Sequence, residues 1–216
     1  MTSESQTVTA IEHRPSLAER KRRVTRDAVV DAAIEAIGDV GIDFAVQDAA
    51  DRAGVTHRTV YRYFESREAL LDAVGERYEA RLAEQGIRQP ETVEDLLVQI
   101  ESLFGLFDQS PDVVRAHAMR VLMGGPRTAL SGRRTERWRR MFEAGFPHLT
   151  RDEVEPLFAI CRSLAGSLGW YLLTSQFGLS GEQSGRAVRR AVEAVIADLR
   201  RQEEEAARTA ASGRER

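Results

Sequence analysis

Residues 46–64 read VQDAADRAGVTHRTVYRYF, and this stretch decides the fold prediction. Ala49 and Ala50 are small and Gly54 follows them, as a helix-turn-helix requires where its two helices cross closely. Val60 and Phe64 supply apolar side chains for the inner face of the second helix. The stretch therefore predicts two short helices joined by a tight turn.

The segment from Thr56 to Phe64 also carries an unusual outer face. Thr56 stands where it can cap the helix, because its hydroxyl can accept from the first free backbone N–H groups. The remaining positions are hydrogen-bond donors and rings: His57, Arg58, Thr59, Tyr61, Arg62 and Tyr63. A face that only meets solvent has no need of two tyrosines among arginines, whereas a face laid against phosphates and base edges does.

Outward from this stretch the apolar residues keep a helical period. We expect a helix from Thr25 to about Gly38, and another from Arg67 to about Glu84 with Ser66 as its cap. Two long amphipathic helices are expected at about 151–177 and 182–201. We find no alternating strand pattern. The prediction is an all-α fold of about nine helices.

Composition limits the class of protein. The chain has 216 residues, of which 42% are hydrophobic, so it can form a core. Its 31 Lys and Arg against 34 Asp and Glu give a net charge of −3, so any nucleic-acid contact must use a local basic patch. A single cysteine, Cys161, excludes an internal disulfide framework. With no apolar leader and no apolar run of membrane-spanning length, we expect a cytoplasmic protein without a membrane partner.

Four parts follow from these patterns. Residues 1–20 are expected to be a disordered basic arm, and residues 21–84 a DNA-binding domain. Residues 90–202 are expected to form a helical domain, and 203–216 a polar tail or frayed helix. The run around Arg20 to Arg23 is read either as a solvated tail or as a basic contact to DNA.

Residues 25–75 resemble the DNA-binding domain of the TetR (tetracycline repressor) family of bacterial transcriptional regulators. The match runs through Val29, Val30, Asp31, Ala32 and Ala33, then Gly41, Val46, Ala50 to Thr56, Thr59 to Phe64, and Arg67 to Leu71. It covers about fifty of the 216 residues. The rest of the chain matches the family only in length and helical character.

Three positions depart from the family pattern. Ala45 stands where a Ser or Thr usually caps the second helix, and Asp43 is the expected substitute. Ala49 stands where the family often has isoleucine, so the local core is expected to be smaller than in the family. Arg67 stands where the family commonly has lysine. It keeps the positive charge, but its planar guanidinium presents its hydrogen-bond donors in a fork.

The resemblance and the chemistry of the side chains assign roles. His57, Arg58 and Thr59 lie in the first turn, which enters the major groove in this motif. Arg58 is the candidate for base readout, with a contact to phosphate alone as the alternative. Tyr61 and Tyr63 are expected at the DNA backbone, although Tyr63 can instead pack against the first helix. The further expected DNA contacts are Thr56, Arg62, Arg67, Arg22 and Arg23.

The resemblance implies a second domain that binds a small effector and forms a homodimer. We expect the last two helices to pair with their copies, and Gly166 and Gly169 to allow close approach of helices. The candidate pocket residues, each of which can equally be plain core, are Phe104, Phe107, Met119, Met123, Trp138, Phe142, Phe158, Trp170 and Tyr171.

Other candidate groups have a simpler interpretation. The arginines around Trp138, among them Arg134, can attract an acidic ligand but are more typical of a solvated face. His117 is more typical of a satisfied core histidine than of a ligand sensor. Cys161 is typical of a small buried apolar residue.

An enzyme is not expected. Residues 165–169, AGSLG, resemble a nucleophile elbow around Ser167, but the elbow needs a preceding strand and a later histidine. We expect no cofactor and no metal site. The sequence thus predicts a homodimeric regulator, a repressor released from a near-palindromic double-stranded DNA operator by a small molecule. The alternative is a helical ligand-binding or protein-interaction module that has lost specific DNA binding.

Overall fold

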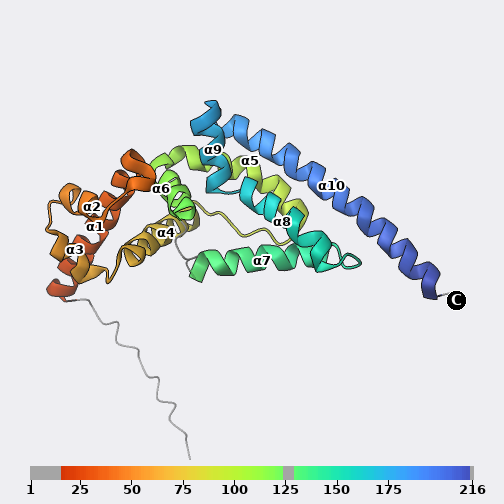
Figure 1. The fold of residues 1–216 in the computed structure, drawn as a ribbon, viewed down its shortest axis with the longest axis horizontal. Helices are drawn as coiled ribbons and strands as arrows, with labels where there is room; N and C mark the ends of the chain where they lie inside the picture. Colours follow the sequence, from red (N-terminus) through yellow and green to blue (C-terminus); the bar gives the residue numbers. More distant parts are fainter. Residues whose placement is uncertain (1–15, 124–128, 215–216) are drawn as a thin grey trace, which may run out of the picture.

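The computed structural model describes residues 16–123 and 129–214. Over these ranges the chain is all-helical, which confirms the predicted class, with ten α-helices where about nine were expected (Figure 1). The helices are α1 (Leu17–Val40), α2 (Val46–Arg52), α3 (His57–Tyr63), α4 (Arg67–Glu84), α5 (Val93–Gln109), α6 (Pro111–Leu122), α7 (Ala129–Gly145), α8 (Arg151–Leu164), α9 (Ser167–Phe177) and α10 (Gly181–Arg214). A short 3-10 helix, η1 (Gly41–Asp43), joins α1 to α2.

The first four helices surround one hydrophobic core. Ile37 of α1, Ala50 of α2, Val60 of α3 and Leu70 of α4 are all buried in it. Phe44, between η1 and α2, closes the core at the turn. This core holds α3 at the end of the molecule farthest from the C-terminus (Figure 1).

The remaining helices build a second core. α5 and α10 run side by side, and Phe104 and Phe107 of α5 belong to the same buried cluster as Ile196 and Leu199 of α10. Phe142 of α7 lies in the same cluster. Residues 203–214, the larger part of the expected polar tail, are helical and belong to α10. The last turns of this helix extend beyond the other helices (Figure 1).

Two helices belong to both cores. On α4, Leu70 faces the first core and Tyr78 the second. On α6, Ala116 and Met119 pack in the first core and Val114 in the second. A displacement of α4 or α6 therefore acts on both halves of the molecule.

The first helix begins earlier than predicted. Ser16 caps α1: its Oγ accepts from the Glu19 N–H, and the Glu19 carboxylate accepts from the Ser16 N–H. Thr25, the expected cap, lies inside the helix and donates its hydroxyl to the Lys21 carbonyl. Residues 17–20 are thus helical rather than a disordered arm, while residues 1–15 lie outside the described range.

The expected long helix at 151–177 is two helices. α8 ends at Leu164, and α9 starts at Ser167 after a break at Ala165 and Gly166. A Cβ at Gly169 would lie 2.0 Å from the Leu164 carbonyl oxygen, so the corner requires glycine there. Gly169 therefore serves the close approach of α8 and α9 at this corner.

Within the described ranges no single helix is both long and apolar enough to cross a membrane. α8 and α9, bent by 57° at their break, pass that test only as a pair, by length and composition.

Candidate nucleic-acid interface

Helix α3 presents a polar face outward. Its cap is formed as predicted, since the Thr56 Oγ1 accepts from the Thr59 N–H at 3.2 Å. Val60 and Phe64 turn inward and are buried, which leaves His57, Arg58 and Tyr61 exposed. The first turn of α3 is therefore open to a ligand as large as a nucleic acid.

Arg58 is the side chain best placed to read bases. It is exposed and makes no hydrogen bond or ion pair with the described part of the chain. A shallow depression of about 430 Å³ runs over this face, lined by Thr56, Arg58, Thr59, Tyr61 and Arg62. His57 packs edge-on against Tyr61, with ring centroids 4.8 Å apart, so the two rings brace each other.

Tyr63 is half-buried at the edge of this face. The Arg62 guanidinium lies over its ring, 5.3 Å from the centroid. A hydrogen bond with Arg62 lowers the pKa of the Tyr63 phenol, and Thr25 and Arg22 act in the same direction. The N-terminal part of α1 therefore lies near the C-terminal end of α3. Arg22 and Arg23 are exposed there on a helix, not on a flexible arm.

Arg67 is engaged inside the protein. Its Nε and Nη2 donate to the Phe44 carbonyl at 3.3 and 3.2 Å, and Nη2 lies 3.0 Å from the Met123 sulfur. Met123 follows the last residue of α6. These contacts tie the start of α4 to the turn before α2 and to α6. They favour a positioning role over the predicted phosphate contact.

The start of α2 also differs from expectation. Ala45 has no capping side chain, but its N–H donates to the Asp48 carboxylate at 2.7 Å. Asp48, rather than the expected Asp43, thus supplies the negative charge at this helix N-terminus, where it is favourable.

Residues 29–74, which span the second half of α1 and all of α2 and α3 and reach into α4, match the family model for bacterial regulatory proteins of the tetR family. These residues carry the DNA-binding domain of a TetR-family transcriptional regulator. Its DNA-binding helix-turn-helix is α2, the turn at Gly54 and α3.

Two solved structures are similar to the regulator. One is a TetR transcriptional regulator from Rhodococcus sp. RHA1, with 20% identity and a TM-score of 0.49 over 83% of this chain and 99% of that chain. The other is a gamma-butyrolactone receptor described as ArpA-like, with 17% identity and a TM-score of 0.47 over 79% of this chain and 99% of that chain. No curated protein matches the sequence.

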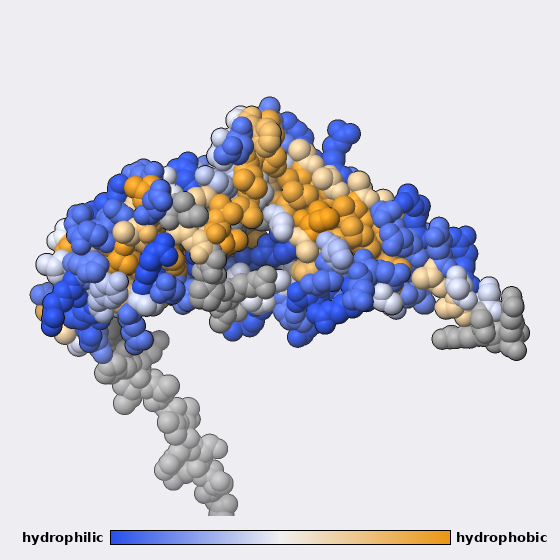
Figure 2. Space-filling view, in the orientation of Figure 1, coloured by the Kyte–Doolittle hydropathy of each residue, from blue (hydrophilic) through white to orange (hydrophobic). Residues whose placement is uncertain are grey.

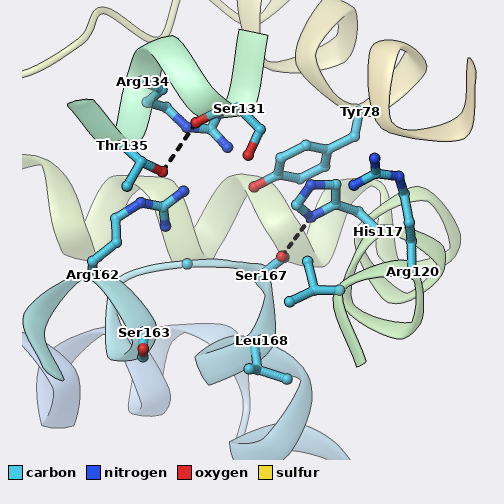
Figure 3. A pocket seen from close by; sticks show the side chains of 12 residues that line it. Tyr78, His117, Arg120, Ser131, Arg134, Thr135, Arg162, Ser163, Ser167 and Leu168 are labelled. Carbon is cyan, nitrogen blue, oxygen red and sulfur yellow. Dashed lines mark hydrogen bonds between the residues drawn. The ribbon is translucent and has the colours of Figure 1, made fainter. Parts of the chain in front are cut away.

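A cavity of about 340 Å³ lies in the second half of the regulator, among α4, α6, α7, α8 and α9 (Figure 3). Its described lining is rich in polar side chains. The lining residues are Tyr78, His117, Arg120, Val121, Ser131, Arg134, Thr135, Arg162, Ser163, Gly166, Ser167 and Leu168.

None of the nine predicted pocket residues lies among the described residues of this lining. Six of them pack in the second core: Phe104, Phe107, Trp138, Phe142, Phe158 and Trp170. Met119 is buried in the first core, and Met123 and Tyr171 pack at its edge. The nine predicted residues thus pack in the interior, and the described lining of the cavity consists of other residues.

His117 and Ser167 are brought together in this cavity. The His117 Nδ1 lies 2.7 Å from the Ser167 Oγ, and both side chains are buried. Burial lowers the pKa of His117 well below its ordinary value, and the nearby Arg134, Arg120 and Arg162 lower it further. The pair lacks the orienting carboxylate of a nucleophilic triad among the described lining residues, and arginines surround it instead.

Sequence reasoning missed this cavity because its residues come from five helices. His117 was correctly expected to be a satisfied, buried histidine. Arg134 belonged to an arginine run that is typical of a solvated face, yet its side chain is only 10% exposed. Cys161 is buried in the core, and burial raises the pKa of its thiol to about 12.

Proposed function

We propose that the regulator is a homodimeric repressor that binds a near-palindromic operator and leaves it when a small molecule fills the cavity. The observation that carries this proposal is the exposed face of α3, with Arg58 held by the helix and engaged by no other described group. In this role the regulator acts on chromosomal DNA in the cytoplasm.

Each protomer would place the first turn of α3 in a major groove. Arg58 can donate two hydrogen bonds to a guanine, the commonest specific contact of arginine with a base. Arg62, Tyr61 and the basic start of α1 lie around it and suit contacts to phosphate oxygens. Two such helices in a dimer must lie about 34–36 Å apart, or a multiple of that, to read two half-sites.

The dimer face is proposed on α8, α9 and α10. Figure 2 shows apolar side chains gathered over this region. Three large apolar residues are exposed there: Ile160 is 48% exposed, Leu172 is 43% and Phe177 is 72%. The occupant is a second copy of the chain, because a palindromic operator requires two α3 helices related by a twofold axis.

The cavity has a direct mechanical link to the DNA-binding domain. Tyr78 of α4 and His117 of α6 line it, and both helices also pack in the first core. α6 contacts α1, α4 and η1. A ligand that favours one placement of these helices changes the distance between the two α3 helices. A coupling of about 1–3 kcal/mol would change operator affinity by roughly 5–150-fold.

A reporter assay tests the repressor assignment. A duplex selected by the wild-type protein is placed between a promoter and a reporter gene. The wild type should lower reporter expression, and Arg58→Ala should not. Higher expression with the wild type would contradict repression and indicate an activator. Equal repression by both proteins would contradict the role of Arg58, and a wild type that leaves expression at its level without the protein would contradict repression.

A further inference from the structure

The cavity concentrates positive charge. Arg120 of α6, Arg134 of α7 and Arg162 of α8 all line it. The Arg120 side chain is 2% exposed, and Arg134 is 10% exposed. Three guanidinium groups from three helices therefore meet around one space, although burying like charges together is unfavourable.

In the described part of the chain, two acids of α4 pair with arginines of this cluster. Asp72 of α4 pairs with Arg120, and Glu79 of α4 pairs with Arg134 at 2.6 Å. Neither acid lies among the described lining residues, which include no carboxylate at all. The Glu79 contact uses Nη1 of Arg134, one of the five donors of a guanidinium. The cavity thus faces its contents with cations and hydroxyl groups.

The lining also has an apolar side. The Tyr78 and His117 rings stack with centroids 3.9 Å apart, and Leu168 and Val121 are further apolar residues of the lining. In Figure 3, Arg134, Arg162 and Thr135 lie on one side of the cavity, and Tyr78 and His117 lie on the other. A volume of about 340 Å³ is in the range of small-molecule sites and larger than an inorganic ion needs.

We infer that the effector is a small organic oxyanion, with its carboxylate or phosphate group held by Arg134 and Arg162 and its apolar part against Tyr78 and Leu168. The guanidinium fork matches both oxyanions by two parallel hydrogen bonds. The inference deepens the proposed function, since it rests on the cavity being the effector site. It names the chemical class of effector that this lining selects.

The inferred preference for an oxyanion is tested by calorimetric titration of the full-length protein without DNA. The probes are benzoate, phenyl phosphate and neutral benzamide, at equal ionic strength. The three probes share a ring and differ in the group that meets the arginines. Benzoate or phenyl phosphate should bind, and benzamide should bind at least about tenfold more weakly. The tighter of the two anions assigns the oxyanion as carboxylate or phosphate.

Variants locate the binding. Arg162→Gln should weaken the anion by about ten- to hundredfold. The double variant Glu79→Gln, Arg134→Gln should weaken anion binding to a similar extent. It removes both partners of the ion pair, so Glu79 is not left buried without Arg134. Arg133→Gln is the matched control, because Arg133 is exposed on the same helix α7 and does not line the cavity. Thermal unfolding of each variant verifies that it folds.

Three outcomes would overturn the inference: no anion binds the wild type, benzamide binds as tightly as benzoate, or Arg162→Gln binds the anion as Arg133→Gln does. DNA binding by the ligand-free protein is measured separately. A protein that binds benzoate but no specific DNA refutes the proposed function, and a protein that binds specific DNA but no anion refutes the inference.

Discussion

The Tyr78 ring on α4 stacks on the His117 ring on α6, with centroids 3.9 Å apart and planes inclined by 12°. This contact joins the two helices that belong to both hydrophobic cores, and both rings face the cavity. The stacked pair therefore stands between the proposed effector and the helices that carry the DNA-binding domain.

Arg58→Ala should relax the base preference of the regulator. Loss of a bidentate contact with guanine costs about 1–3 kcal/mol of discrimination. The measurement is competition between a selected duplex and a duplex altered at one half-site guanine. Arg140→Ala on α7 is the control, because that side chain is 75% exposed and far along the chain from α3. Unchanged discrimination in Arg58→Ala would refute its base-reading role.

Arg67→Ala should destabilise the DNA-binding domain. The Phe44 carbonyl would lose its two donor contacts, at a cost of about 1–3 kcal/mol in the free energy of unfolding. Denaturant unfolding measures this loss. Affinity for DNA should fall while its salt dependence stays unchanged. A phosphate contact would instead reduce the salt slope by about one per protomer with stability unaltered.

Ile160→Arg should turn the dimer into a monomer. The exposed side chain lies on the proposed face of α8, where a charge cannot be buried without a partner. Light scattering after size-exclusion chromatography gives the mass. Val98→Arg on α5 is the control, since Val98 is 75% exposed outside that face. A dimer that survives Ile160→Arg and dissociates with Val98→Arg would place the interface elsewhere.

Gly169→Ala should destabilise the corner between α8 and α9. The added Cβ would meet the Leu164 carbonyl oxygen at 2.0 Å, and such overpacking costs about 1–3 kcal/mol or more. Thermal unfolding should show a lower midpoint. Gly132→Ala on α7 meets no atom within 4 Å, so it should be neutral or stabilising. Equal midpoints for the two variants would contradict this view of the corner.

His117→Gln should flatten the pH dependence of stability. The pKa of His117 is lowered in the folded state, chiefly by burial, so the unfolded state takes up its proton first. Wild-type stability is therefore full above about pH 6.5 and falls as the pH drops below that value. The difference in unfolding free energy between wild type and variant, measured from pH 7.5 to 5.5, isolates this group. A difference that grows with falling pH would contradict the assignment.

The proposed DNA-binding face could be predicted from the sequence because it is contiguous. Thr56 caps α3, and Arg58 and Tyr61, three residues apart on this short helix, lie on one side of it. The helical period also predicted most element boundaries. It failed at Ala165 and Gly166, because the apolar period continues through the break between α8 and α9 and so hides it.

The cavity was not predictable by the same reasoning. Arg120, Arg134 and Arg162 lie on different helices and meet only when α6, α7 and α8 pack. Within its own helix each one is typical of a surface position. The start of α1 was missed for a related reason: residues 17–24 extend into solvent, so they show no apolar period, and only the Ser16–Glu19 capping box marks the beginning.

Selection of bound duplexes from a random DNA pool by the wild-type protein, at physiological salt, tests whether a dimer reads an operator through Arg58 of α3. The wild type should enrich a near-palindromic sequence whose half-site centres are about 34–36 Å apart, or a multiple of that, along the helix axis. Arg58→Ala should fail to enrich the same sequence. A wild-type dimer that enriches no sequence, or enriches the same one as Arg58→Ala, would refute this mode of recognition.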